Sequence, residues 1–109
     1  MVTIVEILAP TSVDDDEMAE ILGNVRLQEK SRTSILLDIT EVQDYSMEAH
    51  RVLIDWAKAN AKRLDRIAVL SDHSIWDCLV SVLAKESKVS TKTFSTHDRA
   101  TLWLGQARS

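Results

Sequence analysis

The chain contains 109 residues, of which 45% are hydrophobic and 28% are charged, and its formal net charge is -4. This size and composition predict one globular domain spanning residues 1–109. The acidic balance argues against nucleic-acid binding, and no apolar stretch is long enough for insertion into a membrane. The single cysteine, Cys78, cannot form an internal disulfide, and no signal-peptide pattern is seen, so the cytoplasm is the expected compartment.

Four short apolar or β-branched segments alternate with segments of helical spacing. The predicted strands are Val2–Leu8, Ser34–Ile39, Arg66–Ser71 and Thr91–Ser95. The apolar stripes of the four predicted helices are, in turn, Met18, Ile21, Leu22 and Val25; His50, Leu53, Ile54, Ala57, Ala61 and Leu64; Ile75, Leu79, Val82 and Leu83; and Ala100, Trp103 and Leu104. The predicted N-caps of these helices are Ser12, Ser46, Ser74 and Ser95, and Gly105 suits the end of the last helix.

Charge is uneven along the chain. Residues 1–48 hold 11 acidic and 3 basic residues, whereas residues 49–109 hold 6 acidic and 10 basic residues. The acidic run Asp14–Glu17 is expected in the first turn of a helix, where the helix dipole favours negative charge. A partner-binding acidic patch and a metal site are the alternatives for this run.

Strands that alternate with helices predict an α/β fold with a four-stranded, mainly parallel sheet built from repeated βα units. The apolar runs 35–37 and 67–70 are typical of interior strands, and the first and last strands are expected at the edges. If every crossover is right-handed and advances in one direction, the helices lie largely on one face of the sheet. We therefore expect another element, or a second subunit in a homodimer, to cover the opposite face.

The segment Ile35–Ser46 resembles STAS domains, the sulfate-transporter and anti-sigma-factor-antagonist group with the SpoIIAA-like fold. In those domains an apolar strand runs into Leu-Asp-Leu-Ser-Gly-Val, and residues 37–42 here read Leu-Asp-Ile-Thr-Glu-Val. The order of later features is similar to the bacterial STAS/Sec14-like branch and extends the resemblance over about residues 30–105. Those features are Tyr45 and Ser46 in a turn, the strand 66–70, Trp76, Phe94, and Trp103 with Leu104.

The resemblance implies a SpoIIAA-like fold and a regulatory role. The regulatory Asp-Ser-Ser positions of the antagonists, whose serines are available for phosphorylation, fall near Ser46, Met47 and Glu48, and neither serine is kept. Glu48 puts a permanent negative charge where a phosphate would otherwise come and go, so a phosphorylation switch of that type is not expected. Ser46 is expected to cap the following helix, although its hydroxyl remains phosphorylatable in principle.

Candidate binding residues follow the carboxyl ends of the strands, where open α/β sheets gather ligands. They are Asp44, Tyr45, Ser46, Asp72, His73 and Trp76. No spacing matches a metal motif and no Gly-rich phosphate loop is present, so neither a metal nor another cofactor is predicted. His50 is expected in the core, bonded to a backbone carbonyl or to Asp38, and Cys78 is expected to be buried.

The sequence favours a non-enzymatic regulatory or protein-interaction module whose protein partner it does not identify. The alternative is a binding protein for a small lipophilic ligand, because the fold is shared with Sec14-like lipid-transfer domains. A hydrolase or redox activity using His73 or Cys78 is a third and weaker hypothesis.

Overall fold

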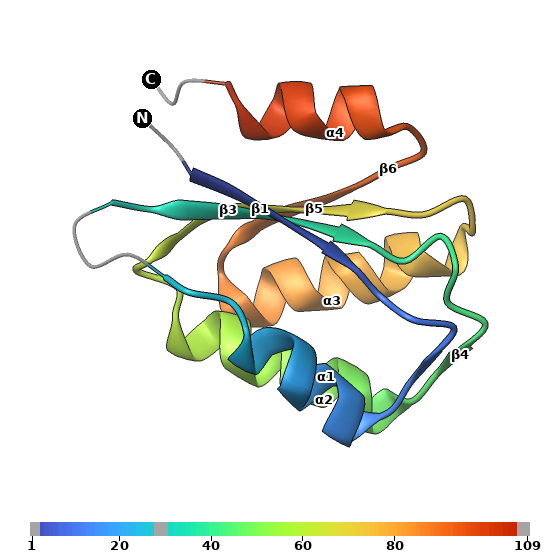
Figure 1. Ribbon diagram of the computed structural model, residues 1–109. Coiled ribbons are helices and arrows are strands. Elements are labelled where there is room, and N and C mark those ends of the chain that lie inside the picture. Colours follow the sequence, from blue (N-terminus) through green and yellow to red (C-terminus); the bar gives the residue numbers. More distant parts are fainter. Residues whose placement is uncertain (1–2, 28–30, 107–109) are drawn as a thin grey trace.

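The computed structural model describes residues 3–27 and 31–106, and its centre is a four-stranded parallel sheet (Figure 1). The strands of this sheet, in spatial order, are β1 (Thr3–Leu8), β3 (Thr33–Asp38), β5 (Leu64–Leu70) and β6 (Ser90–Phe94). The helices are α1 (Asp15–Gly23), α2 (Met47–Ala59), α3 (Ile75–Ser87) and α4 (His97–Leu104). The predicted α/β fold and sequential strand order are confirmed, although Val2 of the first predicted strand lies outside the described residues.

The two interior strands are the ones that the apolar runs predicted. β3 and β5 lie between the edge strands β1 and β6, and Leu36, Leu37 and Ile67 are fully buried. Burying each such side chain contributes about 1.5–3 kcal/mol relative to leaving it exposed. The runs 35–37 and 67–70 within these strands are apolar at every position, as expected where both faces of a strand are covered.

A second, two-stranded parallel sheet was not predicted. It pairs β2 (Ser12–Val13) with β4 (Asp44–Tyr45), and it joins the loops that follow β1 and β3. Strands of two residues carry no readable periodicity, so sequence reasoning treated both as loops. Because Ser12 is part of β2, it does not cap α1, and the Oδ1 of Asp14 accepts the capping bond from the Glu17 N–H instead.

The other helix starts agree with prediction to different degrees. The hydroxyl of Ser46 accepts from the Ala49 N–H at 3.0 Å, which confirms this cap of α2. Ser74 stands at the start of α3 but makes no capping hydrogen bond. The cap of α4 is Thr96 rather than Ser95. Gly105 ends α4 as expected.

The buried stripe of α3 differs from the predicted one. Its buried residues are Trp76, Val80, Leu83 and Ser87, whereas Ile75 and Val82 are exposed. Cys78 is also exposed, so its predicted burial was wrong. The helix is apolar around much of its circumference, and periodicity alone therefore did not show which side faces the sheet.

Helices lie on both faces of the sheet. α1, α2 and α3 lie on one face, and α4 crosses the other (Figure 1). Ala100 and Leu104 of α4 are buried against Leu36 and Ala68. The expectation that helices lie largely on one face thus holds for three of them, and α4 supplies cover for the opposite face. It can do so because the chain turns back over the sheet after the last strand instead of making another crossover.

The guanidinium of Arg66 fastens the end of α4. It donates to the Trp103 carbonyl at 2.6 Å and lies 5.0 Å from the centroid of the Trp103 ring.

Within residues 3–27 and 31–106, no helix is both long and apolar enough to cross a membrane.

Candidate functional site

The candidate site lies where the four parallel strands end. Leu8, Asp38, Leu70 and Phe94 are register partners in one row across the sheet, so the loops that follow them leave from a common edge. We call this side the carboxyl edge. The N-termini of all four helices also lie there (Figure 1), as expected of βα units.

A partly buried hydrogen-bond chain connects this edge to α3. The Tyr45 phenol oxygen lies 2.8 Å from His50 Nδ1, and His50 Nε2 lies 3.0 Å from the Leu79 carbonyl oxygen. A carbonyl only accepts, so Nε2 of the neutral ring carries the proton and Nδ1 accepts from the Tyr45 hydroxyl. His50 is 2% exposed, which confirms the predicted core histidine. Its partner is a backbone carbonyl and not Asp38.

Burial keeps both members of this pair in their neutral forms. Desolvation lowers the pKa of His50 below 6.5; the nearby charge of Arg51 also lowers it, whereas the Leu79 carbonyl and Glu86 act in the opposite direction. Burial raises the pKa of the Tyr45 hydroxyl well above 10. The pair is therefore a neutral structural link near pH 7, rather than an acid and base prepared for proton transfer.

Two of the predicted site residues are in direct contact. The rings of Tyr45 and Trp76 have centroids 4.6 Å apart, and His50 approaches both rings from α2. Trp76 is only 5% exposed, so its ring packs against the inner side of Tyr45. This contact places the start of α2 beside the start of α3.

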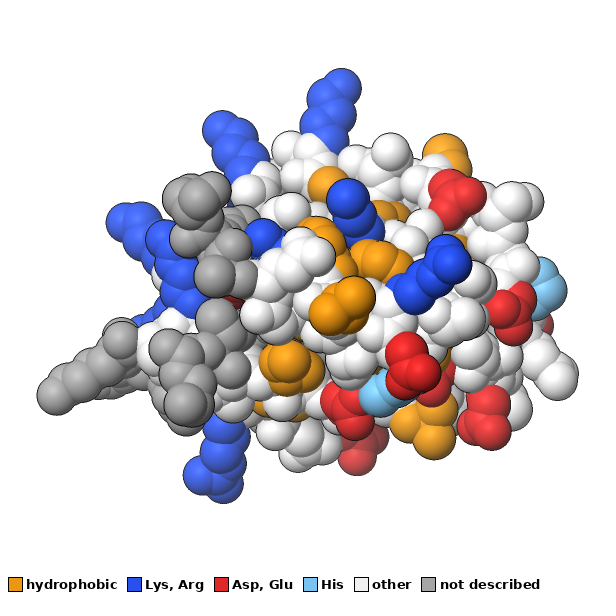
Figure 2. All heavy atoms as spheres, turned by 90° about the horizontal axis from the view of Figure 1, so that it is seen from above, with side chains coloured by type: hydrophobic (Ala, Val, Ile, Leu, Met, Phe, Trp, Pro, Cys, Tyr) orange, Lys and Arg blue, Asp and Glu red, His pale blue; other side chains and the backbone are white. Residues whose placement is uncertain are grey.

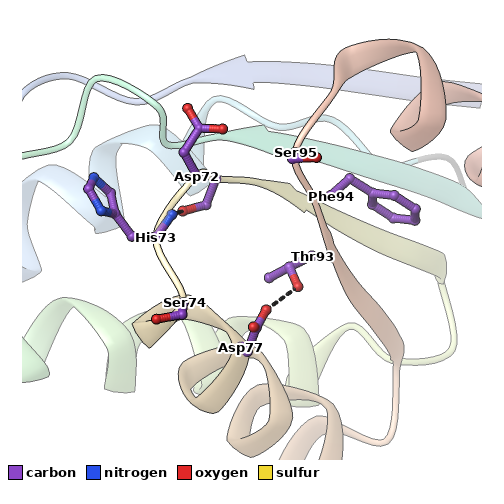
Figure 3. A pocket seen from close by; sticks show the side chains of 8 residues that line it. Asp72, His73, Ser74, Asp77, Thr93, Phe94 and Ser95 are labelled. Carbon is purple, nitrogen blue, oxygen red and sulfur yellow. Dashed lines mark hydrogen bonds between the residues drawn. The ribbon is translucent and has the colours of Figure 1, made fainter.

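Asp72 and His73 line a separate, polar pocket. Its volume is about 300 Å³, and its lining is Ser71, Asp72, His73, Ser74, Asp77, Thr93, Phe94 and Ser95. In Figure 3 the His73 ring and the Asp72 carboxylate point in different directions, and neither points toward the hydrogen bond of 2.6 Å from Thr93 to Asp77. These groups do not converge on one point where a reacting atom could sit.

Asp38, Ser46 and Glu48 have local roles at this edge. Asp38 closes the turn after β3, since its Oδ1 accepts from both the backbone N–H and the hydroxyl of Thr40. Ser46 caps α2, and Glu48 lies in the first turn of that helix. Asp44, in β4, is exposed. In the described parts of the chain, no cluster of three or more His, Cys, Asp or Glu residues is suited to hold a metal ion.

Sequence reasoning missed the exposed apolar side chains of this edge. Met47 is 67% exposed and Ile75 is 68% exposed, and Leu8 is exposed at the end of β1. Met47 and Ile75 are the first residues of α2 and α3, and each directly follows a serine. This position at the start of a helix is the feature of the sequence that could have indicated their exposure. The first residue of these helices projects from the helix end and not along its buried side.

Comparisons with known proteins agree with this architecture. The model of the SpoIIAA-like family matches residues 4–105. A solved structure from Shewanella loihica PV-4, described as an uncharacterized protein from the DUF3478 family with a SpoIIAA-like fold, is similar with a TM-score of 0.55 and 22% identity. The match covers 66% of this chain and 59% of that chain, and it shows the fold alone. No curated protein matches this chain.

Proposed function

The chain belongs to the SpoIIAA-like family, and we propose that it is a non-enzymatic module that binds another protein through its carboxyl edge. The contact surface consists of the loops and helix starts that carry Asp44, Tyr45, Ser46, Asp72 and His73, together with the exposed side chains of Met47 and Ile75. Trp76 contributes indirectly, by holding Tyr45 in place.

The observation that carries this proposal is the exposure of Met47 and Ile75 next to the contact between Tyr45 and Trp76. Tyr45 lies two residues before Met47, and Trp76 directly follows Ile75, so the contact between these two rings joins the two helix starts that present the exposed side chains. Exposed large apolar side chains bordered by polar residues are typical of protein contact sites. Their exposure costs solvation free energy that a partner would recover.

The phosphorylation switch of antagonist proteins is not part of this proposal. The Ser46 oxygen already accepts the Ala49 N–H. The Glu48 carboxylate supplies a constant negative charge in the same turn. A module with this helix start binds its partner constitutively, or under control that does not involve this serine.

Binding of a small lipophilic ligand is less well supported. The pocket beside Asp72 and His73 is lined mostly by hydroxyl, carboxylate and imidazole side chains, whereas lipophilic ligands require a mainly apolar lining. Catalysis by His73 has no geometric support either, because the Asp72 carboxylate does not orient its ring (Figure 3).

Affinity capture of the whole tagged chain from cells of its source organism tests the proposal. We expect a protein to co-purify in stoichiometric amount with the wild type and with Leu102→Ser, and to be lost with the double variant M47S/I75S. Leu102 is a matched control because it is 70% exposed but lies on α4, over the other face of the sheet. A chain that purifies alone and monomeric contradicts the proposal, and a bound lipophilic mass in native mass spectrometry would favour the alternative.

A further inference from the structure

Charge is segregated between the two ends of the sheet. The four segments that form the carboxyl edge (8–18, 38–50, 70–77 and 94–99) contain eleven acidic residues and one basic residue, Arg99 at the start of α4. At the opposite end, the described loop residues 24–27, 31–32, 60–63 and 88–89 contain five basic residues and no acidic one. In Figure 2 the acidic side chains accordingly gather at one end of the molecule, and most of the basic ones lie elsewhere.

Local structure accounts for only part of this acidic surface. Asp14 caps α1, and the first turns of the four helices hold six further carboxylates, which the helix dipoles stabilise. Glu41, Asp44 and Asp72 lie outside these turns, and all three are exposed. Within the described residues, none of these three carboxylates forms a hydrogen bond or an ion pair.

The unused charge lies beside the exposed apolar side chains. Asp44 precedes Met47 by three residues and Asp72 precedes Ile75 by three residues, while the contact of Tyr45 with Trp76 joins the two segments. The surface therefore consists of the exposed side chains of Met47 and Ile75, bordered by negatively charged side chains. Arg51 follows Met47 by four residues, but its guanidinium pairs with Glu86 and Asp55.

We propose that the occupant of this surface is a cationic amphipathic segment of another protein, with apolar side chains that contact Met47 and Ile75 and Lys or Arg side chains that face Asp44 and Asp72. This inference rests on the proposed function and names the chemistry of the partner. A second copy of this chain is the alternative occupant, because its basic end is complementary in charge to the acidic carboxyl edge. However, its loops 24–27, 31–32, 60–63 and 88–89 carry none of the exposed large apolar side chains, so a second copy gives Met47 and Ile75 no apolar counterpart.

Fluorescence anisotropy with two synthetic helical peptides tests the inference. Both peptides carry the same leucine heptads, and their remaining positions are Lys in one and Glu in the other. We expect the whole chain to bind the Lys–Leu peptide only. Binding should weaken steeply from ~0.01 M to ~0.15 M salt, as the Debye length shortens from about 30 to about 8 Å.

Matched variants separate the apolar contribution from the charged one. M47S/I75S and D44N/D72N should each weaken binding about tenfold or more, as expected where apolar burial and charge pairing both matter. Leu102→Ser and Asp55→Asn should change it less than about twofold, since exposed side chains outside a contact contribute little. Asp55 lies well after the first turn of α2 and is exposed.

Three results would overturn the inference. The first is that both peptides bind equally well, and the second is that D44N/D72N binds the Lys–Leu peptide as tightly as the wild type does. The third is that light scattering shows self-association of the peptide or of the protein that accounts for the anisotropy signal. If the capture experiment still yields a partner that depends on Met47 and Ile75, the protein-binding function stands and only the cationic character of the partner is rejected. If capture fails as well, both proposals fall.

Discussion

The Tyr45 hydroxyl and the Nδ1 atom of His50 lie 2.8 Å apart, and this hydrogen bond joins the loop after β3 to the buried face of α2. The opposite ring nitrogen of His50 bonds the Leu79 carbonyl of α3. One side chain therefore links three elements behind the proposed contact surface. His50 is buried, so loss of these two hydrogen bonds should lower the stability of the fold. It should also disturb the proposed contact surface.

Tyr45→Phe should lower the free energy of unfolding by about 1–3 kcal/mol, because Nδ1 of a buried histidine loses its donor. Urea unfolding measures this change. In a His50→Leu background the same substitution should cost much less, giving a coupling energy of about 0.5–3 kcal/mol. Equal costs in the two backgrounds would show that the hydrogen bond carries no weight.

Stability should decrease as the pH falls below about 6.5, with a slope of at most about 1.4 kcal/mol per pH unit from His50. Burial lowers the pKa of His50 in the folded chain, so the unfolded chain takes up this proton first and protonation favours unfolding. Above pH 6.5 the contribution is fully present. Urea unfolding at stepped pH values should show this loss in the wild type and not in His50→Leu; parallel curves would contradict it.

Thr33→Val should raise the free energy of unfolding by about 1 kcal/mol, because burying an unpaired hydroxyl carries a cost of this order. Thr33 is fully buried, and its hydroxyl has no hydrogen-bond partner within the described residues. Thr101→Val is the control, since that hydroxyl donates to backbone carbonyls at 3.0 Å. A gain of equal size in the control would refute the explanation.

Ser46→Ala should cost about 1 kcal/mol of stability, because the Ala49 N–H loses its acceptor at the start of α2. Ser74→Ala should change stability little, since Ser74 stands at the start of α3 without a side-chain capping bond. Thermal unfolding of both variants makes the comparison. The capping account fails if the two substitutions have the same effect.

The strand order and the core were predictable because they depend on burial. The runs 35–37 and 67–70 are apolar at every position, which is favourable only for strands covered on both faces. Helix starts were predicted less well, since Asp14 and Thr96 cap α1 and α4 where Ser12 and Ser95 were expected. Several adjacent residues there can accept the same N–H groups, and the backbone conformation decides which one does.

The contacts among the predicted site residues could be foreseen only in part. Tyr45 and Trp76 were both named, but their contact with His50 depends on the packing of α2 against α3. Ile75 was assigned to a buried stripe and is exposed. The rotation of a helix with a wide apolar arc is set by its neighbours, which the sequence does not display.

Site-specific photo-crosslinking from position 47 tests the central claim most directly. A benzophenone amino acid replaces Met47 in one variant of the whole chain and Leu102 in another; these side chains are 67% and 70% exposed. Irradiation in cells of the source organism should yield one discrete protein adduct from position 47 and none from position 102. No adduct from position 47, or the same adducts from both positions, would contradict the account.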